Sequence, residues 1–220
     1  EKILKMNKKF QDNNDEQFIE SGRIFIRGEI DEESEEHLSR HLRQACFDGL
    51  SSVYIYISSE GGDVDSACAM IDEINGAKKR GVEIITIALG RAYSAAAYLL
   101  TFGDKKYATE NTTIMLHPIL FELDMDYISN QKAYTSFTEK KYDEIIAKVA
   151  KNCGKTTKAS IIKFRKDIEH GLWLNPSTAK KMKVIDEIWD YSKEPRIDEE
   201  GKRRRSQKGS EQSRQHQCDE

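Results

Sequence analysis

Short apolar runs rich in isoleucine and aromatic residues alternate with amphipathic segments along the first half of the chain. Branched and aromatic side chains favour strands, and apolar residues that recur every three to four positions favour helices. The predicted strands are 23–30, 52–58 and 82–87, and the predicted helices are 32–49 and a segment that begins at Val64. Strands that alternate with helices predict an α/β fold with a covered sheet.

The second half continues this pattern with shorter strands and a longer helix. We expect a strand pair formed by the segment around 104–106 and by 112–117, and then helices at 128–152 and 157–169 and a last strand at 184–188. The apolar stripe of the long helix is Tyr134, Phe137, Tyr142, Ile145, Ile146 and Val149.

The two ends of the chain differ from its middle. Residues 1–18 form a polar N-terminal arm with no apolar core typical of a secretion signal, and residues 193–220 have so little to bury that we expect a disordered charged tail. One domain at 19–192 remains between them. The 220 residues carry 35 basic and 38 acidic side chains, a balance that argues against a dedicated nucleic-acid binder.

The apolar and cysteine content limits the cellular setting. No apolar run reaches the roughly 18 residues that a membrane-spanning helix needs. The four cysteines show neither C-x-x-C nor metal-ligand spacing, so we expect reduced thiols, no metal site and a cytoplasmic location.

The segment 90–101 carries the first candidate for chemistry. Gly90 allows a sharp turn after the strand, and Ser94 stands where a helix begins, followed by Ala95, Ala96 and Ala97. Serine at such a position is often only a helix cap. The same position also suits a nucleophile that must stabilise an oxyanion beside it.

Two further segments add to this candidate. Ser58 to Asp63 contains the pair Gly61-Gly62 between a strand and a helix, where backbone amides are accessible. His117 ends an apolar strand, where sites in α/β folds gather, and histidine is the usual base for an attacking serine.

Taken together and in order, these segments resemble the family of ClpP, the proteolytic subunit of the ATP-dependent Clp protease. The similarity rests on Ile57 to Val64, Gly90 to Leu100, Met115 to Pro118, Arg23 to Ile30, and Trp173 through Asp186.

The resemblance implies a fold and a set of roles. The fold is expected to be the ClpP/crotonase-like repeated β-β-α spiral, with a protruding helical handle that contains 128–152. Ser94 would be the nucleophile and His117 the general base, and the amides of Gly62 and Ala95 would form the oxyanion hole. No cofactor is implied.

The resemblance also implies partners. Such subunits assemble as homo-oligomers, usually two stacked heptamers, and hydrolyse unfolded polypeptides or peptides that a hexameric AAA+ unfoldase of the Clp type feeds to them.

The sequence departs from the family's pattern at three places. The first concerns the acid of the catalytic triad, which the matching segments do not identify: Asp167 is the candidate and Glu169 the reserve, or the acid is absent. Glu60 stands where the family has proline, and both ends of the chain lack the family's usual form. Two alternatives follow: an inactive structural ring subunit like ClpR, and a crotonase-type acyl-CoA enzyme on the same fold.

Overall fold

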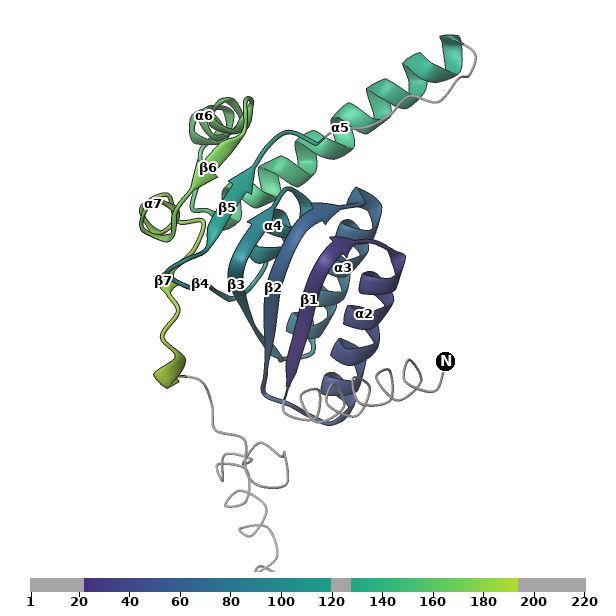
Figure 1. Cartoon of the computed structure of the whole chain (residues 1–220). Helices are drawn as coiled ribbons and strands as arrows, with labels where there is room; N and C mark the ends of the chain where they lie inside the picture. Colours follow the sequence, from purple (N-terminus) through teal and green to yellow (C-terminus); the bar gives the residue numbers. More distant parts are fainter. Residues whose placement is uncertain (1–21, 120–127, 194–220) are drawn as a thin grey trace, which may run out of the picture.

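The computed structural model describes residues 22–119 and 128–193 (Figure 1). The predicted N-terminal arm lies outside the described residues, and so does the predicted tail except for its first residue.

The described chain forms a seven-stranded sheet that is parallel except at one pair. The order is β1-β2-β3-β4-β7, and β5 pairs with both β3 and β6. Only β5 and β6 are antiparallel among these neighbours. The strands are β1 (Arg23–Ile30), β2 (Ser52–Gly62), β3 (Glu83–Tyr93), β4 (Lys105–Ala108), β5 (Thr113–Leu116), β6 (Leu172–Leu174) and β7 (Glu187–Ile188).

Two helices cover one face of this sheet. The helices α2 (Glu32–Phe47) and α3 (Val64–Lys79) follow β1 and β2 directly. Side chains alternate between the faces of a strand, and in β2 Ile55 and Ile57 join the main core, whereas Tyr56 between them joins a smaller cluster with Trp189. The α/β prediction is therefore confirmed, with the main core between the sheet and its helices.

The strand β3 changes its neighbour at Gly90. It pairs with β4 up to Ala88 and with β5 from Arg91 onward. Gly90 has a φ of +70°, and its amide donates to Thr112 Oγ1 at 3.2 Å, while this hydroxyl donates to the Ala88 carbonyl at 3.0 Å. The turn predicted at Gly90 is therefore wrong, because β3 continues through it to Tyr93.

The remaining helices come later in the chain, and the first of them packs on β2 and β3 beside α3. They are α4 (Ala95–Leu100), α5 (Ile128–Asn152), α6 (Lys158–Ile168), α7 (Pro176–Lys181) and the short 3-10 helix η1 (Tyr191–Lys193). One end of α5 extends far from the body, as the protruding helix in Figure 1 shows. Ile145, Ile146 and Val149 of its predicted stripe are buried, whereas Tyr134 and Phe137 are 52 % and 66 % exposed.

Three further predictions need correction. The strands β4 and β5 do not pair with each other, since each pairs with β3. The strand predicted at 52–58 extends to Gly62, so the two glycines end a strand instead of following it. The last strand covers only Glu187–Ile188, and β6 and α7 were not predicted.

Candidate active site

Ser94 occupies a strained position between β3 and α4. Its φ of 53° and ψ of −124° are unusual for a residue with a side chain, and such strain costs about 1–3 kcal/mol and gathers at functional sites. Ser94 stands at the N-cap position of α4, but its side chain makes no capping hydrogen bond. Capping therefore does not explain this serine.

The segment that carries His117 lies beside Ser94. Tyr93 is the register partner of Met115, and the Ser94 amide donates to the Met115 carbonyl at 2.8 Å. His117 follows two residues later and is half-buried. Parallel pairing of β3 with β5 thus brings both predicted residues to the same end of the sheet.

The two glycines of β2 serve different contacts. A Cβ atom on Gly61 would lie 2.7 Å from the Tyr93 carbonyl oxygen and 2.8 Å from Ser94 Cβ. A Cβ atom on Gly62 would lie 2.2 Å from the Ile30 carbonyl oxygen. Gly61 therefore allows β2 to approach Ser94, and Gly62 allows it to approach the end of β1.

The predicted oxyanion donors lie on these same segments. A Cβ atom on Gly61 would also come within 3.1 Å of the Ala95 amide nitrogen, so the glycine pair and the start of α4 are adjacent. Ala95 is buried and Gly62 is exposed.

The candidate acids lie at the end of α6. Both carboxylate oxygens of Asp167 accept from Lys163 Nζ at 2.9 Å, and the Asp167 side chain is 31 % exposed. Glu169 is the exposed C-cap residue of α6. Among the described residues, the partner of Asp167 is thus a lysine of its own helix.

Glu60, at the position where the family has proline, forms an ion pair with Arg91 at 2.9 Å. The pair joins β2 to β3 directly before Gly61 and three residues before Ser94. The negative charge of Glu60 beside the site is therefore matched by the positive charge of Arg91.

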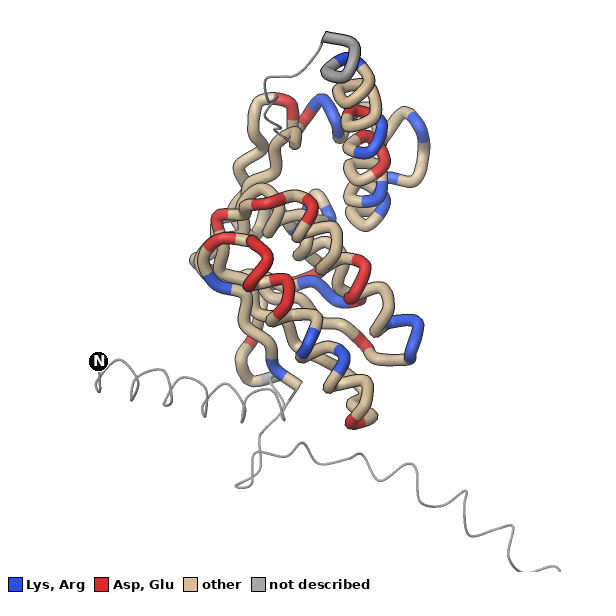
Figure 2. Tube along the Cα trace, turned by 90° about the vertical axis from the view of Figure 1, so that its right-hand side faces the viewer, with Lys and Arg blue, Asp and Glu red and all other residues tan. Residues whose placement is uncertain are grey.

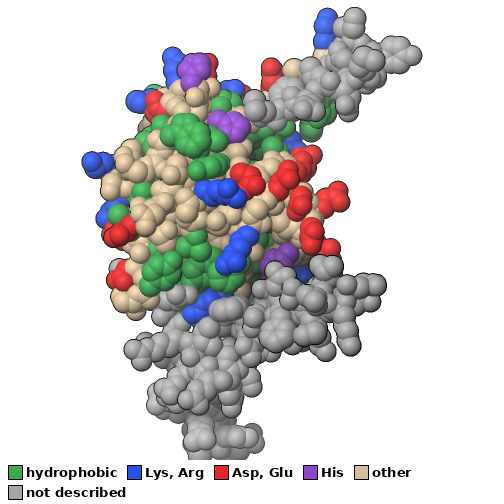
Figure 3. All heavy atoms as spheres, in the orientation of Figure 1, with side chains coloured by type: hydrophobic (Ala, Val, Ile, Leu, Met, Phe, Trp, Pro, Cys, Tyr) green, Lys and Arg blue, Asp and Glu red, His purple; other side chains and the backbone are tan. Residues whose placement is uncertain are grey.

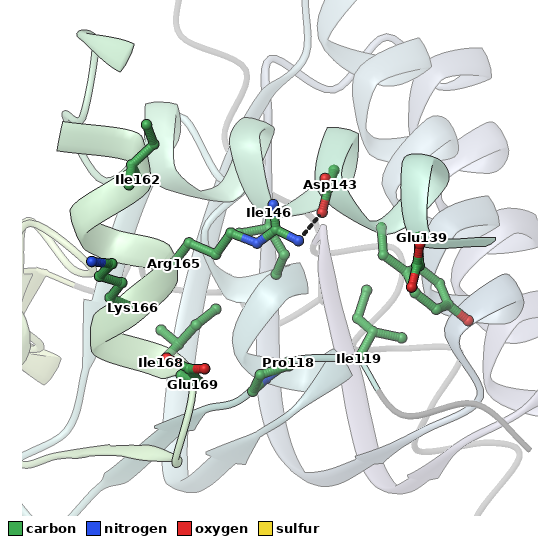
Figure 4. Close-up of a pocket in the computed structure, with 11 residues that line it drawn as sticks. Pro118, Ile119, Glu139, Asp143, Ile146, Ile162, Arg165, Lys166, Ile168 and Glu169 are labelled. Carbon is green, nitrogen blue, oxygen red and sulfur yellow. Dashed lines mark ion pairs between the residues drawn. The ribbon is translucent and has the colours of Figure 1, made fainter. Parts of the chain in front are cut away.

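A pocket of about 480 Å³ begins at Pro118, the residue after His117, and extends between α5 and α6 (Figure 4). Its apolar lining includes Ile119, Ile146 and Ile168, and Asp143 and Arg165 form an ion pair across it. The pocket can therefore receive an apolar side chain, and the ion pair can contact polar groups beside that side chain.

Acidic residues gather where β1 and β2 lead into α2 and α3. Figures 2 and 3 show them along one side of the body. The first turn of α2 contains Glu32, Glu33 and Glu35, and that of α3 contains Asp65. Because β1 and β2 end beside the glycine pair, this acidic edge borders the site.

In 22–119 and 128–193, no helix has the length and apolar character to cross a membrane. Within the same ranges, His, Cys, Asp and Glu do not gather in groups of three or more that could hold a metal ion.

Three contacts near the site were not predicted from the sequence. Gly61 approaches Ser94, Trp173 stacks edge-on against Tyr93 with ring centroids 5.3 Å apart, and the Tyr98 hydroxyl donates a hydrogen bond to the His117 carbonyl. Tyr98 stands four residues, about one helical turn, after Ser94, and this spacing is a sequence signal that could have indicated it.

Comparison with known families agrees with this arrangement. The family model of the Clp protease matches residues 7–192, which is most of the chain. The fold is accordingly the α/β, ClpP/crotonase-like fold, and at the level of the family the chain is a ClpP-type peptidase. The chain belongs to the Clp protease family.

Proposed function

We propose that this chain is a serine endopeptidase subunit in which Ser94 attacks the peptide carbonyl and His117 takes its proton. The observation that carries the proposal is the conformation of Ser94. Its backbone is strained and hydrogen-bonded to the segment that leads to His117, and its side chain makes no capping hydrogen bond. A strained turn between strand and helix is a common way to present a nucleophile.

The chemistry follows the general course of acyl transfer. The Ser94 oxygen bonds to the carbonyl carbon, and the amides of Gly62 and Ala95 stabilise the resulting oxyanion. His117 then gives its proton to the leaving amine, which leaves an acyl-enzyme. Water, deprotonated by His117, hydrolyses the ester and restores the serine.

The pocket beside His117 supports a role in substrate binding. Its position directly after the base and its apolar lining suit a side chain of the substrate next to the cleaved bond. In the family, substrates are unfolded polypeptides delivered by an AAA+ unfoldase, and we propose the same source here.

We also propose that the chain acts within a ring of identical subunits, with two rings stacked through α5. The exposed aromatic residues Tyr134 and Phe137 on its protruding half support this assembly, because large exposed apolar side chains mark contact surfaces.

One observation favours the alternative of an inactive, ClpR-like ring subunit. The carboxylate of Asp167 is held by Lys163, and a triad without its acid loses about 10⁴-fold in rate. Activity then requires Asp167 to leave Lys163, or another group to orient His117.

A fluorophosphonate probe tests the proposal. The assembled wild-type protein is expected to label at one site per chain, and Ser94→Ala and His117→Ala are expected to abolish labelling. Wild-type protein that assembles but stays unlabelled would support the structural subunit.

Asp167 is tested by the same probe. If Asp167 orients His117, Asp167→Asn lowers the labelling rate about 10²- to 10⁴-fold. The matched control is Lys163→Met, which frees Asp167 and is expected to retain or raise the rate. Equal rates in Asp167→Asn and wild type would exclude Asp167 from the triad.

A further inference from the structure

Tyr98 links the helix of the nucleophile to the segment of the base. The Tyr98 amide donates to the Ser94 carbonyl at 3.1 Å, so these two residues form the first turn of α4. The Tyr98 hydroxyl donates a hydrogen bond to the backbone carbonyl of His117, and the residue is only 3 % exposed.

The hydrogen bond from Tyr98 reaches the chain directly after its last residue paired in the sheet. β5 ends at Leu116, whose register partner on β6 is Leu172, and the pairing of β5 with β3 stops at Met115. His117 follows the last paired residue and precedes Pro118, which has no amide hydrogen to give to a strand. The bond from Tyr98 is therefore positioned to fix the peptide group of His117.

The hydroxyl is suited to this role across a wide pH range. Burial raises the pKa of Tyr98 above its ordinary value, so the phenol keeps its proton and remains a donor. A phenylalanine would fill the same space but would leave the His117 carbonyl without this bond.

We propose that Tyr98 is a positioning residue that holds His117 in register with Ser94 through the backbone carbonyl of the histidine. The proposal rests on the peptidase function proposed above. Tyr98 does not touch the substrate, so its loss is expected to affect the chemical step and not binding. Small errors in the position of a catalytic group can cost up to about 10²-fold in rate.

The first measurement is the kinetics of Tyr98→Phe with a short fluorogenic peptide. We expect kcat to fall about 10-fold and KM to change less than about 2-fold, since the substrate pocket is unaltered. Tyr107→Phe, which removes a hydroxyl from β4, is the matched control and is expected to keep the wild-type kcat. Circular dichroism and thermal unfolding check that both variants fold, and Tyr98→Met is a second variant without the hydroxyl should Tyr98→Phe not assemble.

The second measurement does not depend on peptidase activity. Diethyl pyrocarbonate modifies imidazoles, and the rate at His117 is followed by mass spectrometry of its peptide. Freed from Tyr98, His117 is expected to react at least about 3-fold faster in Tyr98→Phe than in wild type or Tyr107→Phe.

The outcomes separate the two proposals. An unchanged modification rate at His117 in Tyr98→Phe overturns the positioning role, even if kcat falls. A wild-type protein that fluorophosphonate does not label contradicts the peptidase function, but a faster modification rate in Tyr98→Phe would still support the role of Tyr98.

Discussion

At the scale of single residues, the close approach of Gly61 to Ser94 leaves no room for a side chain on the glycine. Gly61 has a φ of +95°, and the two nearest atoms to its missing Cβ belong to Tyr93 and Ser94. A side chain at this position therefore meets both backbone strain and a direct clash.

Gly61→Ala is expected to lower the free energy of unfolding by about 2 kcal/mol or more and to abolish labelling of Ser94. The matched control is Gly49→Ala, because Gly49 has a φ of +68° but no atom within 4 Å of its missing Cβ. This control is expected to cost only the strain of about 1 kcal/mol and to keep activity. Denaturant unfolding and probe labelling measure both effects, and equal behaviour of the two variants would contradict the clash.

His41 gives a prediction for stability as a function of pH. Burial first, and then the charges of His37 and Arg40, lower the pKa of His41 from 6.5 to about 4. The folded state thus binds this proton more weakly than the unfolded state, so stability is full above about pH 6.5 and falls as pH decreases toward 4.

Unfolding by urea between pH 4 and pH 7.5 measures this dependence. His41→Gln is expected to flatten it, whereas His170→Gln, which replaces an exposed histidine, is expected to leave it unchanged. A wild-type protein whose unfolding free energy is constant from pH 6.5 to pH 4.5 would be inconsistent with a buried neutral His41.

At the scale of elements, the ends of β2 and β3 are joined by the ion pair of Glu60 and Arg91. Both side chains are about half exposed, at 50 % and 47 %, so the pair is screened by solvent. Its contribution to stability therefore comes from linking the ends of the two strands and not from burial of the two charges.

A double-mutant cycle with Glu60→Gln and Arg91→Gln is expected to give a coupling free energy of about 0.2–1 kcal/mol at low salt. In 1 M NaCl the coupling is expected to disappear, because the screening length then falls to about 3 Å. Coupling that persists in high salt would show that the two residues interact by packing and not by charge.

The elements that could be predicted best from the sequence were those in which apolar residues recur at regular spacing. The strand at 23–30 and the helix at 128–152 match β1 and α5 in full, because each has a continuous apolar pattern. β6, α7 and the partner of β5 were missed because their short segments are fixed by contacts between distant residues, such as Trp173 with Met115.

The residues of the site also fall into those that could be predicted from the sequence and those that could not. Ser94 and His117 were predicted from their segments, and the structure places the two segments side by side. The roles of Gly61 and Tyr98 depend on what lies across from them in space, which local pattern does not encode. The pairing of Asp167 with Lys163 follows from their spacing of four residues on α6. The sequence alone did not indicate whether the carboxylate would pair with this lysine or with His117.

At the scale of the whole molecule, α5 combines a buried half with an exposed half. Ile145, Ile146 and Val149 anchor it in the core, while Tyr134 and Phe137 face solvent in the single chain. In the double ring proposed above, we expect this exposed half to be covered by the opposite ring.

Replacing Tyr134 and Phe137 together by serine is expected to convert double rings into single rings, because it removes apolar area from the contact. Sedimentation velocity measures the change, and the monomer fold is expected to persist, as seen by circular dichroism. Lys140→Ser, an exposed substitution on the same helix, is the control. Unaltered sedimentation of the double variant would place the contact between rings elsewhere.

The exchange of partners by β3 at Gly90 determines which strands support the proposed catalytic residues. His117, the proposed base, directly follows β5. This strand pairs with β3, which ends next to Ser94, the proposed nucleophile, and not with its neighbour in sequence, β4. A partner that docks on the outer edge formed by β7 would reach this common support, within the sheet, through β4, the strand that lies between β7 and β3.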